Sequence, residues 1–138
     1  CALFNSQKME VDFFNLNNTA INLSVRAMKL CTVLDRMPST TNLSDRAKKQ
    51  ILDTITENIL NLVGYTAPEF VPDQEVITKL TLAATACAKI QGTLLLYNNL
   101  QPIPDNSLLT LLMEISQFGN KLRSVAAPEE NVETPAKE

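Results

Sequence analysis

Histidine and tryptophan are absent from this chain of 138 residues, and glycine occurs only three times, at Gly64, Gly92 and Gly119. Without histidine there is no imidazole general base, no Ser-His or Cys-His nucleophile pair and no ordinary zinc site. Three isolated glycines cannot form the glycine-rich loop that brings backbone N–H groups onto a phosphate. We therefore expect a protein that is not an enzyme and that holds no cofactor and no metal.

An excess of charge is also missing. The chain has 12 basic and 15 acidic residues, a net charge of -3, and residues 125–138 carry four of the acids and one base. Residues 1–124 are therefore neutral overall, and we expect no nucleic-acid partner. No segment approaches the roughly 18 uninterrupted apolar residues of a membrane-spanning helix, so we expect none.

A helical period of apolar residues is what the sequence does contain. In four segments the apolar residues follow one another at alternating steps of three and four, which places them on one face of a helix. The first helix is expected to begin near Asn17 or Asn18, because the Asn-rich stretch before it has weak helix propensity. It ends before Pro38. Helices are expected over residues 17–37, 44–63, 73–97 and from 105 or 106 to about 122.

The connections between these segments are short, so consecutive helices must reverse direction. The expected fold is all-α, an antiparallel up-down-up-down four-helix bundle. The bundle is expected to occupy residues 15–124 and to follow a tether or frayed turn at 1–14. Residues 125–138, acidic and without an apolar period, are expected to be a disordered tail.

Cys31 and Cys87 lie inside helical segments among apolar neighbours, which does not suit a catalytic thiolate. A disulfide between them would close a loop of 57 residues and stabilise the fold by roughly 4 kcal/mol. Counted from the Phe14 end of the first segment, Cys31 and Cys87 lie at heights that differ by roughly 9 Å, more than a disulfide spans unless the first helix starts later. A disulfide and two free thiols both remain open.

Two groups of residues are candidates for a protein interface. The loop between the second and third segments is braced by prolines and carries aromatic and branched side chains. The third segment carries a row of threonines, whose hydroxyl groups could instead bond to the preceding turn. Equally, the loop could fold down onto the end of the bundle. The candidates are Tyr65, Phe70 and Val71 in the loop, and Thr78, Thr81 and Thr85 on the helix.

A different hypothesis is a carrier of a small apolar ligand, because small residues on the third segment leave room beside the fourth. The pocket would be lined by Leu80, Ala84, Cys87, Ile115 and Phe118. A third hypothesis is a secreted helical signalling protein, although cytokine bundles need longer crossover connections.

Cys1 followed by Ala2 resembles the processed start of a bacterial lipoprotein. The resemblance implies a lipid on the Cys1 sulfur and a bundle anchored at the outer membrane, facing the periplasm or the cell surface. The membrane would be contacted only through this lipid. The leading hypothesis is a non-enzymatic, lipid-anchored helical module that binds or stabilises another protein.

Overall fold

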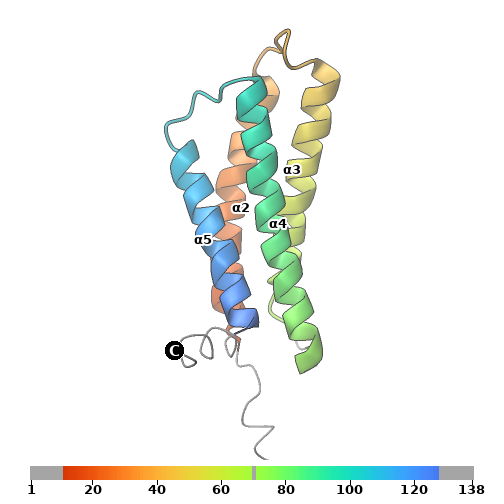
Figure 1. Ribbon diagram of the computed structural model, residues 1–138, viewed down its shortest axis with the longest axis vertical. Helices are drawn as coiled ribbons and strands as arrows, with labels where there is room; N and C mark the ends of the chain where they lie inside the picture. Colours follow the sequence, from red (N-terminus) through yellow and green to blue (C-terminus); the bar gives the residue numbers. More distant parts are fainter. Residues whose placement is uncertain (1–10, 70, 128–138) are drawn as a thin grey trace, which may run out of the picture.

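The computed structural model describes residues 11–69 and 71–127, and these form four helices packed in sequence order. Each helix packs against the next, and α2 also contacts α5 (Figure 1). The predicted all-α fold is confirmed, and the arrangement is consistent with an up-down bundle. Cys1, Phe70 and residues 128–138 lie outside the described residues. The helices are α2 (Phe13–Arg36), α3 (Asp45–Tyr65), α4 (Asp73–Leu100) and α5 (Leu108–Ala126).

The starts of α2 and α5 differ from the expectation by two residues or more, and α3, α4 and α5 end two to four residues later than expected. α2 begins at Phe13, four or five residues early, because the Asp12 side chain accepts a hydrogen bond from the Asn15 backbone N–H at 3.1 Å and caps the first turn. α5 begins later than expected, at Leu108. The Asp105 carboxylate accepts bonds from the Ser107 backbone N–H at 2.8 Å and from the Ser107 hydroxyl at 2.7 Å. These bonds form a turn before the helix instead of a cap.

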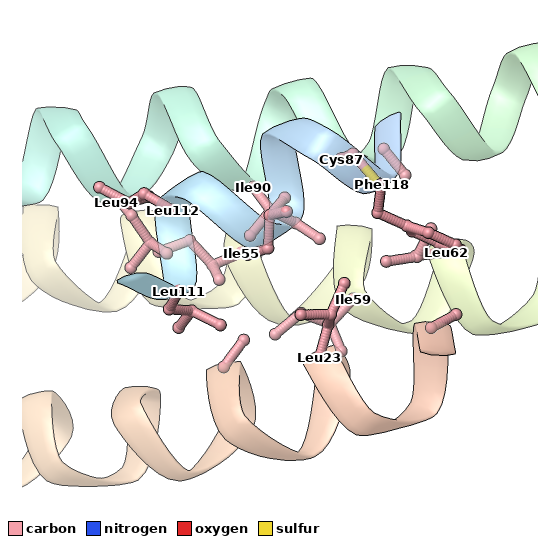
Figure 2. Packing of buried hydrophobic residues seen from close by; sticks show 14 of the residues in the cluster. Leu23, Ile55, Ile59, Leu62, Cys87, Ile90, Leu94, Leu111, Leu112 and Phe118 are labelled. Carbon is pink, nitrogen blue, oxygen red and sulfur yellow. The ribbon is translucent and has the colours of Figure 1, made fainter. Parts of the chain in front are cut away.

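The predicted apolar faces meet along the bundle axis and form one core. Side chains from all four helices interlock there, as Figure 2 shows for Leu23, Ile55, Ile90 and Leu111. Ile55 and Leu94 have no measurable exposure. Burying one such side chain fully stabilises the fold by about 1.5–3 kcal/mol.

Among the helices in the part of the chain that the structure describes, α4 alone is long and apolar enough to cross a membrane by length and composition. This differs from the sequence expectation, since a few scattered charges do not prevent a long helix from reaching that composition. In the structure, ten of its residues are buried, and the helix packs against both α3 and α5. A core helix of a bundle has these same properties.

Candidate functional site

A groove of about 590 Å³ lies between the last turns of α3 and the first turns of α4, beside the loop that joins them. We call it the α3–α4 groove. The end of α3 and the start of α4 lie at the end of the bundle where α2 begins and α5 ends (Figure 1). The lining residues of the groove are Leu60, Asn61, Gly64, Tyr65, Glu69, Val71, Glu75, Thr78, Lys79 and Leu82.

The walls of the groove carry apolar side chains that the fold leaves uncovered. Leu60 on α3 is 61% exposed and Leu82 on α4 is 40% exposed. Tyr65 and Val71 are half-buried at the loop end. Single exposed leucines are normal on a protein surface, whereas leucines that share a concave surface make it a candidate interaction site.

Lys79 fixes the loop that borders the groove. Its ammonium group donates to the Ala67 carbonyl oxygen at 2.8 Å and to Glu69 Oε2 at 3.1 Å, and it lies 4.6 Å from the centre of the Phe13 ring. The Lys79 side chain is only 8% exposed, so these partners replace the water it loses. One side chain of α4 therefore connects to the loop and to the start of α2.

A second set of hydrogen bonds closes the end of α3. The Asn17 side-chain amide donates to the Val63 carbonyl oxygen at 3.2 Å and to the Thr66 hydroxyl at 3.1 Å. The Thr66 hydroxyl donates in turn to the Leu62 carbonyl oxygen at 2.9 Å. These bonds satisfy carbonyl groups that the last helical turn leaves free, and they attach α2 to the end of α3.

The accessible charge of the groove is negative. Glu75 is exposed, and the Glu69 side chain keeps 59% exposure even though it pairs with Lys79. Lys79 is the basic residue of the lining, but its ammonium group is buried and already bonded. A ligand in the groove therefore meets carboxylates and no free cation.

The structure brings some of the predicted interface residues together and separates others. Tyr65, Val71 and Thr78 line the α3–α4 groove. Thr81 lines a different depression of about 480 Å³, between α4 and α5. Thr85 is half-buried, and its hydroxyl donates to the Thr81 carbonyl oxygen at 3.0 Å, the bond to the preceding turn that we gave as the alternative. Phe70 lies outside the described residues.

Sequence reasoning missed several residues of the groove. Leu60 and Leu82 lie off the apolar faces of their helices, so the helical period alone gave no reason to select them. For Lys79 a signal was present, because it lies three residues after Val76 and four before Ala83, on the buried face of α4. A lysine at a core position indicates a buried charge that needs partners.

The residues predicted to line an apolar ligand pocket all lie in the core, where α4 and α5 pack closely. A Cβ atom added at Gly119 would lie 3.3 Å from the Cys87 Cβ atom, and Figure 2 shows Phe118 beside Cys87. Such close packing counts against the cavity that this hypothesis needs. The buried residues are Leu80, Ala84, Cys87, Ile115 and Phe118.

Cys31 and Cys87 are both buried and free. Burial raises the pKa of Cys31 to about 11 and that of Cys87 to about 12, so neither is a reactive thiolate at neutral pH. The Tyr97 hydroxyl donates to the Leu34 carbonyl oxygen at 3.5 Å, and Cys31 lies three residues before Leu34, roughly 5 Å along α2. Cys87 lies ten residues before Tyr97, roughly 15 Å along α4, so the two cysteines differ in height by about 10 Å, too far for a disulfide.

Among residues 11–69 and 71–127, no group of three or more His, Cys, Asp or Glu side chains is placed to hold a metal ion. No protein family model, no curated protein and no solved structure matches this chain. The candidate site therefore depends on the geometry of the α3–α4 groove.

Proposed function

We propose that this protein is a non-enzymatic helical module that binds another protein, and that the α3–α4 groove is its docking site. The observation that carries the proposal is the exposure of Leu60 and Leu82 in one groove whose border Lys79 holds in place. A preformed site binds with a smaller loss of conformational entropy than a site that must be ordered.

The composition of the groove also suits a protein partner. Protein interfaces combine an apolar centre with a polar rim, and aromatic residues are enriched in them. Here Leu60, Leu82 and Val71 are the apolar surface, Tyr65 is aromatic, and Glu75 is on the rim. Neither alternative function, an apolar-ligand carrier or a secreted signalling protein, has a comparable observation in its favour.

Anchoring at the bacterial outer membrane through a lipid on Cys1 is a second part of the proposal. Its support is the Cys1-Ala2 pair, which lies outside the described residues. At about 3.5 Å per residue, the segment from Cys1 to Phe13 would hold the start of α2 within about 40 Å of a lipid attached to Cys1. The intact mass of protein extracted from native membranes tests the anchor: a diacylglycerol and an acyl chain on the N-terminal peptide are expected, and an unmodified terminus would contradict it.

Site-specific crosslinking tests the docking site. A photoreactive phenylalanine analogue replaces Leu60 in the full chain in its native cells, and the same analogue at Leu109 is the control. Leu109 suits this purpose because it is 75% exposed and lies on α5, outside the groove. We expect a crosslinked partner at position 60 and none at position 109.

The crosslinked partner is then purified, and its affinity is measured for the wild-type chain and for variants. We expect Leu60→Ser combined with Leu82→Ser to weaken binding at least about tenfold, because both side chains lose apolar contact area. Leu109→Ser should leave the affinity unchanged. Equal affinities for the wild-type chain and the double variant, with circular dichroism showing both folded, would mean that the partner docks elsewhere.

A further inference from the structure

We propose that the partner segment for the α3–α4 groove is a basic amphipathic helix. Because this inference rests on the proposed docking function, it concerns only the chemistry of the partner. It combines two observations: a hole in the α3–α4 groove that is formed by residues of two helices, and carboxylates at one end of that hole.

The hole is formed by pairs of residues one helical turn apart. Leu60 and Gly64 come from α3, and Thr78 and Leu82 come from α4, all of them in the lining of the groove. When two helices pack, an apolar side chain of one inserts between four residues of the other. Here the four residues come from two neighbouring helices. Two facing pairs with this spacing are a surface that a third helix can pack against, which is the helix-in-groove mode of recognition.

Gly64 keeps this hole open. A Cβ atom added at Gly64 meets no atom within 4 Å, so the space beside it is free. No glycine among residues 11–69 and 71–127 has a positive φ, so the backbone at this position accepts any L-residue. The fold of α3 therefore does not require glycine at position 64, and the free space beside Gly64 can accept a side chain from the partner.

Carboxylates at the loop end of the hole select the charge of the partner. Glu75 lies three residues before Thr78 on α4, is exposed, and pairs with no cation in the part of the chain that the structure describes. The Glu69 side chain, 59% exposed, adds a second carboxylate. A Lys or Arg about one turn from the inserted apolar side chain would meet both, whereas a Glu there would be repelled.

The test uses two synthetic helices of five turns, each with leucines on one face. In one, lysines flank the leucines, and in the other, glutamates replace those lysines. Binding to the full chain is followed by fluorescence anisotropy, and the site is located from backbone amide shifts in NMR spectra. We expect the basic helix to bind at least about tenfold more tightly than the acidic one at low salt. The shifted amides should include those of Gly64, Thr78 and Leu82.

Three variants separate the steps of the inference. Gly64→Leu fills the hole from within, so the basic helix should no longer bind while thermal stability is maintained. Glu75→Gln should reduce the preference for the basic helix about three- to tenfold. Asp35→Asn removes an exposed carboxylate near the C-terminal end of α2 and should change nothing.

The outcomes distinguish this inference from the docking function. If both synthetic helices bind equally well and Gly64→Leu blocks both, the groove docks helices but the basic partner is wrong. If neither helix binds while the position of Leu60 crosslinks to a partner, the helical partner is wrong and the docking function stands. If amide shifts appear away from the groove, or the groove amides shift on dilution because two copies of this chain separate, the proposed partner is also wrong.

Discussion

Lys79 shows what one buried charge does in this bundle. Its ammonium group connects α4 to the Ala67 carbonyl, to Glu69 and to the Phe13 ring, and its side chain has little access to water. Lys49 also pairs with a carboxylate, that of Asp53 at 3.1 Å, but its side chain is 77% exposed. Each of these lysines forms an ion pair with a carboxylate, so together they allow a buried charge to be compared with an exposed one.

We expect Lys79→Met to lower the free energy of unfolding by about 1–3 kcal/mol, because the Ala67 carbonyl loses a charged donor. Lys49→Met should cost less than about 0.5 kcal/mol, since solvent screens an exposed pair. Urea unfolding of both variants measures the difference. In Lys79→Met, amide exchange in residues 66–69 should also become faster. Equal destabilisation by the two substitutions would show that Lys79 does not hold the loop.

The buried thiols predict a loss of stability at alkaline pH. Burial raises the pKa of Cys31 to about 11 and that of Cys87 to about 12, from an ordinary value of 9.0. Well below pH 9.0 both thiols are neutral in the folded and unfolded chains, so their contribution to the free energy of unfolding is fully present. As the pH rises from there towards the folded pKa values, only the unfolded chain ionises, and stability falls.

Replacing both thiols tests this assignment. In Cys31→Ala combined with Cys87→Ala, the free energy of unfolding should fall less steeply between pH 9 and pH 11 than in the wild-type chain. The comparison uses the slope, because the smaller side chains also lower stability at every pH. Identical slopes in the two proteins would assign the alkaline loss to other groups.

The helices themselves contain a second matched pair, Gly92 in α4 and Gly119 in α5. Glycine within a helix is less favourable than alanine by about 0.8–1.0 kcal/mol. A Cβ atom at Gly92 would meet nothing within 4 Å, whereas one at Gly119 would lie 3.3 Å from the Cys87 Cβ atom. That atom is bonded directly to the backbone, so it cannot rotate away.

Gly92→Ala should therefore stabilise the protein by about 0.5–1 kcal/mol. Gly119→Ala should destabilise it, because separating α4 from α5 costs more than the helix propensity returns; overpacking of a core typically costs about 1–3 kcal/mol. Thermal unfolding of the two variants would show midpoints that move in opposite directions. A rise in both midpoints would mean that α4 and α5 can move apart at little cost.

At the scale of the whole molecule, the four helices share one core, so we expect a single cooperative unfolding transition. The two buried cysteines allow this to be measured at two levels of the bundle, about 10 Å apart. Variants that carry Cys1→Ser and keep either Cys31 or Cys87 are labelled with a thiol reagent under native conditions. Both thiols should report the free energy of global unfolding to within about 1 kcal/mol.

Urea unfolding followed by circular dichroism supplies the global value for that comparison. If Cys87 becomes labelled at a lower free energy than Cys31, the packing of α4 against α5 opens before the rest of the bundle. The α3–α4 groove would then have one mobile wall. A preformed groove could no longer be used to support the proposed docking function.

The sequence by itself determined the number of helices, their order and the face that each one buries. These features are local, because the steps of three and four between apolar residues select a helix and mark its buried side. The ends of the helices were harder to predict from the sequence. A cap depends on a single side chain such as that of Asp12. An aspartate can cap a helix or form a turn before it, and the sequence does not show that Asp105 forms the turn.

Part of the groove was also readable from the sequence, since Tyr65, Val71 and Thr78 follow from a proline-braced loop and a polar helix face. Only the tertiary structure decided that Leu60 and Leu82 share the groove. Leu60 and Leu82 are 22 positions apart in the chain, and the height at which α3 passes α4 decides whether they face each other. That height is set by core packing and by the Lys79 contacts, which no pattern within a single helix contains.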